Sequence, residues 1–288
     1  MKQKRTGGVG RSPIDLALIR RALAEDAPRG DVTSEATIPP RAVCRARLVA
    51  KQELVLAGID LFAAVFHTVN KNIQIVKRYR DGAVIPKGAV IAELSGNTRA
   101  ILKGERVALN FLQRLSGVAT LTKSFVNAVE GSGCVILDTR KTTPGLRDLK
   151  KYAVRCGGGR NHRRDLSEMV LLKENHIAAA GGIAEAVARA RAKAGRKMMV
   201  EVETTNFSEV REAIASGADR IMLDNMTPAQ AKKAVGVIAR RAQTEASGNM
   251  NLKTVRAYAK ARVDYISVGS LTHSAPAADV SLLIEVGQ

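Results

Sequence analysis

The second half of the chain repeats one unit, in which a short apolar run ends in polar residues and an amphipathic helical segment follows. The runs are CVILDTR, EMVLLKENH, KMMVEVET, DRIMLDN, QTEASGN and DYISVGS. Between them, segments such as NFSEVREAIASG and NLKTVRAYAKA carry apolar residues at helical spacing. Strands and helices that alternate at this length are typical of βαβ units, so the pattern predicts a parallel sheet.

Each run places its apolar residues first and its charged or small residues at the C-terminal end. In a (β/α) barrel this end of every strand faces the active site, so we expect the run ends to converge on one mouth. The residues concerned are Asp138, Lys173, Glu203, Asp224, Ser247 and Gly269. The runs are fewer than the strands of a complete barrel, which leaves two interpretations: an incomplete (β/α) barrel, or further strands that the pattern does not show.

The first half of the chain has a different pattern, which predicts a separate α+β domain. Residues 14–26 and 60–70 have helical spacing, and segments 41–58 and 72–96 are β-rich runs interrupted by Gly and Pro turns. A long helical stretch over 104–131, as one helix or two, leads into the barrel region. The predicted domains are an N-terminal α+β domain over 1–113 and a barrel over 114–276, and residues 277–288 are expected to pack back on the first domain.

Charge and composition narrow the class of protein. Lys and Arg number 46 against 27 Asp and Glu, a formal net charge of +19 that is dispersed along the chain. Such a surface suits polyanionic substrates or nucleic acid, or serves only solubility. Aromatic residues make up 3% with no Trp, which counts against a nucleic-acid partner because a base-stacking surface needs them.

Three widely spaced cysteines without a CxxC motif favour a reducing compartment and argue against a cysteine zinc site. The basic first residues, MKQKRTGGVGR, lead into no apolar run of the kind that a signal peptide needs. No apolar stretch approaches the roughly 20 residues that span a bilayer. A cytoplasmic protein without a membrane partner is therefore expected.

The predicted mouth combines three kinds of chemistry. Glu203 and Asp224 follow neighbouring strands, and such carboxylates hold Mg²⁺, often through water, or accept hydrogen bonds from sugar hydroxyls. The last two strands end in Ser247-Gly248-Asn249 and Gly269-Ser270, where small residues let backbone N–H groups approach a phosphate.

The first two strands supply the third kind, which is positive charge. They end in Thr139-Arg140-Lys141 and Lys173, and the segment 138–164 between them holds nine Lys or Arg residues, including Arg155 and Arg163 beside His162. Guanidinium groups bind planar carboxylates in bidentate fashion. The residues alone therefore predict an enzyme that acts on a sugar phosphate and a second, carboxylate-bearing molecule, and they do not specify the bond.

Each feature also has a structural interpretation. Asp224 precedes Thr227-Pro228 and is a candidate helix N-cap, and glycines 157–159 suit a flexible connector. His67 and His176 are expected to be structural histidines with hydrogen-bond partners in the fold. The coincidence of six polar run ends of complementary types favours the site.

Taken in order, TRKTTPGLRDLKKYAVRCGGGRNHR, KENHI, VEVET, LDN, EASGN and YISVGSLTHSAPAADVSL resemble the quinolinate phosphoribosyltransferase family, also named nicotinate-nucleotide pyrophosphorylase (carboxylating). GDVTSEATIPP and GERVALNFLQRLSG match its first domain, so the resemblance covers nearly the whole chain. It implies a pentosyltransferase of de novo NAD biosynthesis. That reaction joins quinolinate to phosphoribosyl pyrophosphate with Mg²⁺ and no organic cofactor, and yields nicotinate mononucleotide, pyrophosphate and carbon dioxide. A transport-associated relative of the same fold is the alternative, and the complete TRKTTPG and NHR motifs favour the transferase.

The resemblance also implies roles for individual residues. Thr139, Arg140, His162, Arg163 and Lys173 would surround quinolinate, with Arg106 arriving from the neighbouring subunit of a homodimer or of a larger assembly built from it. Lys141 would face the pyrophosphate, and Glu203 and Asp224 would bind the ribose and, directly or through water, the metal. Ser247, Gly248, Asn249, Val268, Gly269, Ser270 and His273 would hold the 5′-phosphate. Asn249 stands where the family more often has glycine, and Arg164, Asp165 and Arg262 add charge to which the sequence assigns no role.

Overall fold

The computed structural model describes residues 12–285, and these divide into two compact units. The first unit comprises the chain up to Leu121, Asp148–Gly158 and the segment from Ala275 onward, and the second comprises Thr122–Arg147 and Gly159–Ser274. Residues 1–11, to which the signal-peptide expectation refers, lie outside the described part. Within that part, none of the helices combines the length and the apolar character that a membrane crossing requires.

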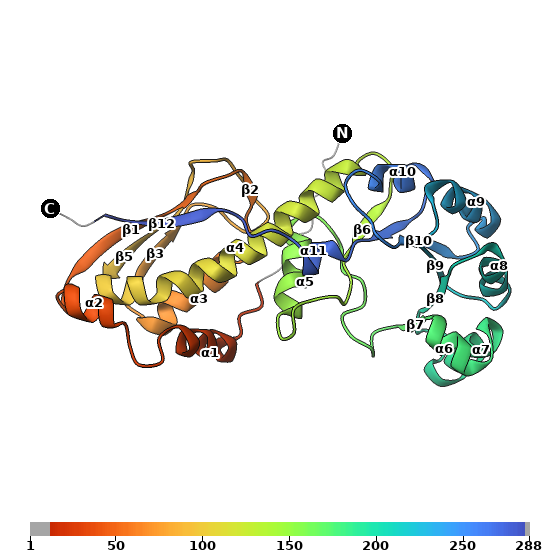
Figure 1. Cartoon of the computed structure of the whole chain (residues 1–288), viewed down its shortest axis with the longest axis horizontal. Coiled ribbons are helices and arrows are strands. Elements are labelled where there is room, and N and C mark those ends of the chain that lie inside the picture. Colours follow the sequence, from red (N-terminus) through yellow and green to blue (C-terminus); the bar gives the residue numbers. More distant parts are fainter. Residues whose placement is uncertain (1–11, 286–288) are drawn as a thin grey trace. The chain divides into compact units, whose positions relative to one another are not determined.

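The first unit is built on a four-stranded antiparallel sheet (Figure 1). Its strands are, in order across the sheet, β12 (Val280–Glu285), β1 (Val43–Ala50), β5 (Val90–Asn97) and β3 (Gln74–Lys77). Along β1 the side chains of Cys44, Ala46 and Leu48 are buried while the alternate positions are exposed or half-buried, as expected of a sheet with one face on a core. Strand β12 pairs with β1, so residues 280–285 belong to this sheet.

Helices complete the first unit. They are α1 (Leu16–Asp26), α2 (Val32–Thr37), α3 (Ile59–Val69), α4 (Thr98–Ala128) and α5 (Arg147–Cys156), and α4 continues into the second unit. The unit also contains a two-stranded antiparallel pair, β2 (Leu54–Val55) and β4 (Val84–Ile85). Two glycines of α4 allow close packing. A Cβ at Gly104 would lie 2.9 Å from the Phe66 ring of α3, and one at Gly117 would lie 1.9 Å from the Pro276 carbonyl oxygen. Glycine is therefore required at Gly117, because a main-chain atom cannot yield as a flexible side chain can.

The second unit is a six-stranded parallel sheet with the order β6-β11-β10-β9-β8-β7. The strands are β6 (Val135–Leu137), β7 (Val170–Leu172), β8 (Val200–Thr204), β9 (Arg220–Asp224), β10 (Gln243–Ser247) and β11 (Tyr265–Ser267). The helices are α6 (Glu174–Ala180), α7 (Ile183–Ala194), α8 (Phe207–Ala215), α9 (Pro228–Ile238), α10 (Val255–Lys260) and α11 (Ser270–His273). Figure 1 shows α8, α9 and α10 outside the strands, as in a (β/α) barrel.

The barrel is incomplete because β6 and β7, the first two strands in the chain, do not pair with each other. The main chain around Arg160 lies instead along the free side of β6. Its N–H donates to the carbonyl of Ile136 at 2.9 Å, and its carbonyl accepts from the N–H of Asp138 at 3.2 Å. The predicted fold class, an α+β domain followed by an incomplete (β/α) barrel, is confirmed, and all six predicted runs form strands.

Two boundaries differ from the sequence expectation. The predicted division between residues 113 and 114 falls inside α4, which is one continuous helix, and the compact units separate after Leu121. The segment Asp148–Gly158, expected within the barrel, belongs to the first unit as most of α5. Its buried Tyr152 explains this, since the hydroxyl donates to Asp81 at 2.7 Å, and Asp81 also accepts the N–H groups of Gly58 and Ile59 at the start of α3.

Candidate functional site

A cavity of about 780 Å³ lies at the C-terminal ends of the parallel strands in the second unit. It brings together every sequence-predicted site residue except Arg106, Asp138, Arg155 and Val268. These lining residues are Thr139, Arg140, Lys141, His162, Arg163, Lys173, Glu203, Asp224, Ser247, Gly248, Asn249, Gly269, Ser270 and His273. The cavity has the size of a small-molecule pocket and is lined mainly by polar and charged groups.

One wall of the cavity is cationic. Arg163 is buried, and its Nη1 donates to the carbonyl of Met169 at 3.2 Å. Burial, together with the neighbouring Arg140 guanidinium, lowers the pKa of Arg163. The Nε of Arg140 is itself buried with no hydrogen-bond partner among the described residues. Two guanidinium groups held side by side, one with an unused donor, form a site that an anion would complete.

The strand-end loop after β6 is fixed by short-range hydrogen bonds. The Thr139 hydroxyl accepts the N–H of Lys141 at 3.1 Å, and the Thr272 hydroxyl donates to the Lys141 carbonyl at 2.8 Å. Asp138, fully buried, accepts from the His162 N–H at 2.9 Å and from the Asn161 amide at 2.6 Å. Asp138 therefore orients the NHR segment and does not line the cavity.

Two carboxylates stand at the ends of neighbouring strands at the mouth. Glu203, at the end of β8, forms an ion pair with the half-exposed Lys173 at the end of β7. Asp224, at the end of β9, accepts from the Asn225 side-chain amide at 2.7 Å. Helix α9 is capped by Thr227 and not by Asp224, so the structural interpretation of Asp224 as an N-cap is wrong.

The loop after β10 approaches the mouth through its main chain. Gly248 has φ +101°, and a Cβ there would lie 2.2 Å from Oδ1 of Asn225 and 2.9 Å from its main-chain nitrogen. Asn249 follows with φ +47°, in the left-handed region that asparagine tolerates better than most residues. This loop therefore fits glycine followed by asparagine, and both residues line the cavity.

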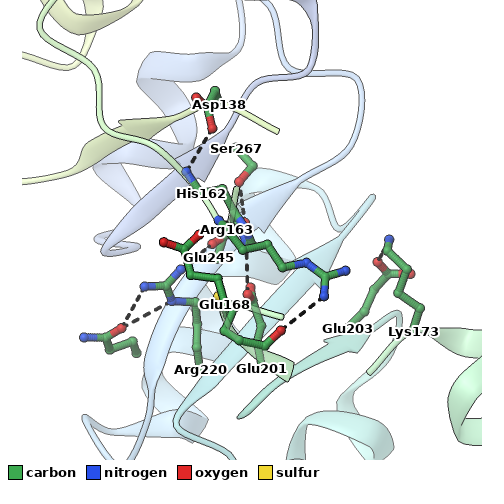
Figure 2. A network of polar contacts seen from close by, with 12 residues as sticks. Asp138, His162, Arg163, Glu168, Lys173, Glu201, Glu203, Arg220, Glu245 and Ser267 are labelled. Carbon is green, nitrogen blue, oxygen red and sulfur yellow. Dashed lines mark hydrogen bonds and ion pairs between the residues drawn. The ribbon is translucent and has the colours of Figure 1, made fainter. Parts of the chain in front are cut away.

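Below the mouth lies a buried ionic network, shown in Figure 2. The His162 Nε2 is 3.1 Å from Oε2 of Glu201 and 3.5 Å from Oε1 of Glu245. Glu245 is also bound by the Arg220 guanidinium at 3.0 Å and by the Ser267 hydroxyl. Arg220 stacks on the Tyr265 ring, 4.2 Å from its centroid. Both glutamates are fully buried.

The network shifts the ionisation of its members. Burial alone would lower the pKa of His162, but hydrogen bonds to Glu201 and Glu245 raise it to about 9. The main-chain N–H of Arg163 donates to Nδ1 of the same ring at 2.8 Å, and this contact opposes a proton on Nδ1. The rise in the pKa of His162 therefore comes from the two carboxylates alone. Burial and the charge of Glu245 raise the pKa of Glu201. For Glu245 the opposite direction holds, because His162, Ser267 and Arg220 outweigh burial and lower its pKa.

Among the described residues, His162, Glu201 and Glu245 form one group whose ligand atoms lie within 4.8 Å of one another, close enough to bind a metal ion. Because Arg220 supplies positive charge to Glu245 and Nε2 of His162 supplies a hydrogen bond to Glu201, the carboxylates of this group already have internal partners. The carboxylates that line the cavity, Glu203 and Asp224, are the better candidates for Mg²⁺. This ion is usually held by one or two carboxylates together with water and substrate phosphates.

The remaining predicted residues lie elsewhere. Val268 is fully buried and binds the Leu137 carbonyl through its N–H. Arg106 is exposed on α4 in the first unit. Arg155, expected on the cationic side of the mouth, is also in the first unit, where it stacks on Tyr152 at 5.5 Å. Arg164 pairs with Asp165 at 3.0 Å in an exposed loop outside the cavity lining.

Two family models match the chain: the N-terminal domain of quinolinate phosphoribosyl transferase over residues 31–116 and its C-terminal domain over residues 118–283. The chain belongs to the quinolinate phosphoribosyltransferase family. The resemblance predicted from the motifs is thereby confirmed.

Similar family members span most of this chain. A probable nicotinate-nucleotide pyrophosphorylase (carboxylating) of Bacillus subtilis is 44% identical, with 92% of this chain and 91% of that protein aligned. The chloroplastic nicotinate-nucleotide pyrophosphorylase of Arabidopsis thaliana is 45% identical over 93% and 82% of the two chains. The solved nicotinate-nucleotide pyrophosphorylase of Francisella tularensis superposes with a TM-score of 0.92 at 43% identity, over 98% of this chain and all (100%) of that one.

Sequence reasoning missed several features of this quinolinate phosphoribosyltransferase site. Leu171, Met222, Asn225 and Met250 line the cavity, and nothing in their local patterns distinguishes them from core or turn residues. Glu201 and Glu245 did carry a signal. Glu201 lies two residues before Glu203 on the same strand, and alternate residues of a strand face the same side. A second carboxylate at that spacing, inside an apolar strand, points to a polar layer beneath the mouth.

Proposed function

We propose that this chain transfers the phosphoribosyl group of phosphoribosyl pyrophosphate to quinolinate, with loss of carbon dioxide, to give nicotinate mononucleotide and pyrophosphate in NAD biosynthesis. The observation that supports this best is one cavity lined both by the guanidinium groups of Arg140 and Arg163 and by the carboxylates of Glu203 and Asp224. The guanidinium groups suit the adjacent carboxylates of quinolinate, and the carboxylates suit a ribose.

We assign quinolinate to Thr139, Arg140, His162, Arg163 and Lys173, which lie at the ends of β6 and β7 and in the segment between them. Lys141 faces the pyrophosphate in this assignment. The 5′-phosphate belongs to Ser247, Gly248, Asn249, Gly269, Ser270 and His273, whose small residues keep the main chain accessible. Val268 does not reach the phosphate in this assignment, because its side chain is buried, and its N–H binds the Leu137 carbonyl next to the strand end.

In the transfer step, the pyridine nitrogen attacks the anomeric carbon as the bond to pyrophosphate breaks. Positive charge develops on the ribose ring, and Glu203 and Asp224 are placed to stabilise it, while Lys141 stabilises the negative charge of the leaving group. Glu203 and Asp224 would hold Mg²⁺ directly or through water molecules, and the bound ion would neutralise pyrophosphate charge. The oxygen ligands present suit this ion.

Decarboxylation follows from the product of transfer. Once the ring nitrogen carries the ribosyl group, it is a pyridinium. The bond from the ring to the 2-carboxylate can then break, with its electron pair left on the ring next to the positive nitrogen and carbon dioxide released. A proton from solvent replaces the carboxylate. The step needs no organic cofactor, and the side chains need only orient the carboxylate that leaves.

The direct test is incubation of the purified protein with quinolinate, phosphoribosyl pyrophosphate and Mg²⁺, with detection of nicotinate mononucleotide and carbon dioxide. Formation of both products supports the proposal. A folded protein that binds either substrate without turnover would favour a noncatalytic relative. We also expect a cytoplasmic location and no nucleic-acid partner, and binding of random DNA that substrates fail to displace would contradict the latter.

We further propose a homodimer in which Arg106 completes the quinolinate site of the neighbouring subunit. Its exposure on α4 is compatible with a contact to another chain. A two-fold dimer makes the contact reciprocal, so Arg106→Ala and Lys173→Ala should each be nearly inactive alone. After subunit exchange, half of the dimers are hybrids with one intact site, and activity should recover to about a quarter of wild type. Exchange without recovery would show that Arg106 acts elsewhere.

A further inference from the structure

Glu201 is energetically costly where it lies. Its side chain is fully buried, and its Oε1 has no hydrogen-bond partner among the described residues. A second buried carboxylate, Glu245, approaches the same histidine. A buried acceptor without a partner destabilises a folded protein, and an apolar side chain of similar volume would avoid that cost. Because stability does not account for Glu201, a functional role would lie in its contacts near the cavity.

Glu201 makes one strong contact, and it leads to the cavity wall. Its Oε2 accepts from Nε2 of His162 at 3.1 Å, whereas Glu245 is 3.5 Å away and is already held by Arg220 and Ser267. Figure 2 shows Glu201 below His162 and Arg163, while Glu203 lies apart with Lys173. His162 and Arg163 both line the cavity, and Glu201 does not.

The contact with Glu201 fixes more than the ring position of His162. Donation from Nε2 to Glu201 requires a proton on Nε2. The opposite nitrogen, Nδ1, accepts the main-chain N–H of Arg163 at 2.8 Å, so it acts as the ring's acceptor. A partner on one ring nitrogen commonly sets the state of the other. Glu201 thereby keeps the ring in the orientation that holds the Arg163 main chain, from which the guanidinium reaches the cavity.

We propose that Glu201 is a positioning residue: as the hydrogen-bond acceptor of His162, it holds His162 and Arg163 in the arrangement that binds the dicarboxylate substrate. This inference rests on the proposed function. It separates the two glutamates of β8, since Glu203 would act on the ribose and Glu201 on quinolinate through its neighbours. The acceptor matters in this proposal, and a negative charge at Glu201 is not required.

Two substitutions distinguish the acceptor from the space it fills. Glu201→Leu removes the acceptor and fills its space with an apolar side chain of similar size. Glu201→Gln keeps an acceptor, because it presents an amide oxygen to His162. Quinolinate affinity, measured by titration calorimetry, and the KM values for both substrates should be determined for each variant. For Glu201→Leu we expect quinolinate affinity to fall about tenfold or more, with the KM for phosphoribosyl pyrophosphate changed by less than about threefold. Glu201→Gln should keep quinolinate affinity within about threefold of wild type.

A matched control is Glu185→Gln, which removes an exposed carboxylate from α7 that pairs with Arg189 and should alter neither constant. Thermal unfolding confirms that each variant is folded. The inference is overturned if folded Glu201→Leu binds quinolinate as wild type does, if both substrates weaken equally, or if Gln is as damaging as Leu. A wild-type protein that neither binds nor converts quinolinate overturns the proposed function itself, which is a different result.

Discussion

Two layers of carboxylates, separated by two residues along a strand, behave differently in the second unit. Glu203 and Asp224 form the upper layer at the mouth, and Glu201 and Glu245 form the lower layer beneath it. In the upper layer Glu203 pairs with a lysine whose side chain is 49% exposed. In the lower layer both side chains are 0% exposed, and their partners His162 and Arg220 are buried. Depth along one strand therefore decides whether a carboxylate lines the cavity or contacts only buried side chains.

The cations divide in the same way. Lys141 and Lys173 are exposed at the mouth, while Arg220 is buried and neutralises Glu245. Arg140 and Arg163 are intermediate cases. Their guanidinium groups are near each other, and the buried Nε of Arg140 has no hydrogen-bond partner among the described residues. Charge that is compensated within the protein stabilises the fold, and charge that is left uncompensated at the cavity is available to an anionic substrate.

The largest expected effect tests that uncompensated charge. Nicotinate lacks one of the two carboxylates of quinolinate, so it would leave cations of the wall unpaired. Sites that hold a group by buried polar contacts reject analogues without it by about 10⁴-fold. The kcat/KM of nicotinate should be lower than that of quinolinate by this order. Comparable values for the two acids would mean that the wall does not read the second carboxylate.

A second prediction compares the same substitution in the two layers. Glu245→Gln leaves the buried Arg220 without its charged partner and should lower the free energy of unfolding by about 3–5 kcal/mol. Glu203→Gln, in the upper layer, should change it by less than about 1 kcal/mol because its lysine partner reaches solvent. Only the second variant should lose kcat while it remains well folded. Denaturant unfolding and steady-state kinetics measure both quantities, and equal destabilisation would abolish the distinction between the layers.

The sequence predicted the upper layer better than the lower. Polar residues at strand ends are visible because they interrupt apolar runs, and parallel strands bring their ends together. The lower layer also depends on His162, which follows the main-chain pairing of Arg160 with β6, and the local sequence pattern does not show that pairing. Arg155 lies outside the cavity lining for a related reason. Tyr152 and the apolar face of α5 join the first unit, so a cationic motif was divided between two units.

A third prediction concerns the pH dependence of the lower layer. The pKa of His162 is raised from 6.5 to about 9, so the folded state binds this proton more tightly than the unfolded state. The resulting stability is present below pH 6.5 and is lost as pH rises through 9. Glu201, whose pKa is also raised, contributes with the same sign, whereas Glu245, with a lowered pKa, contributes stability that is lost in acid. The loss from His162 should be at most about 2–3 kcal/mol, because the main-chain N–H of Arg163 at Nδ1 opposes the second ring proton.

Thermal unfolding across this pH range checks the effect by difference. His162→Asn should remove the loss of stability between pH 6.5 and 9. The upper-layer histidine, His273, is exposed at the mouth, so His273→Asn should keep the wild-type profile. A wild-type profile in His162→Asn would show that the two glutamates do not hold the proton on this ring.

The smallest expected effect lies in the main chain of the mouth. Asn249 has φ +47° and Gly248, before it, has φ +101°, so the loop after β10 depends on two left-handed residues. Asn249→Gly should leave stability and the KM for phosphoribosyl pyrophosphate nearly unchanged, since glycine adopts this conformation without strain. Asn249→Val should cost about 1–2 kcal/mol, because a β-branched side chain is strained there, and should raise that KM more than the KM for quinolinate. If Gly and Val perturb the phosphate substrate equally, the Asn249 side chain itself binds the phosphate. In that case the mouth would recognise the phosphate through side chains, as we propose for quinolinate.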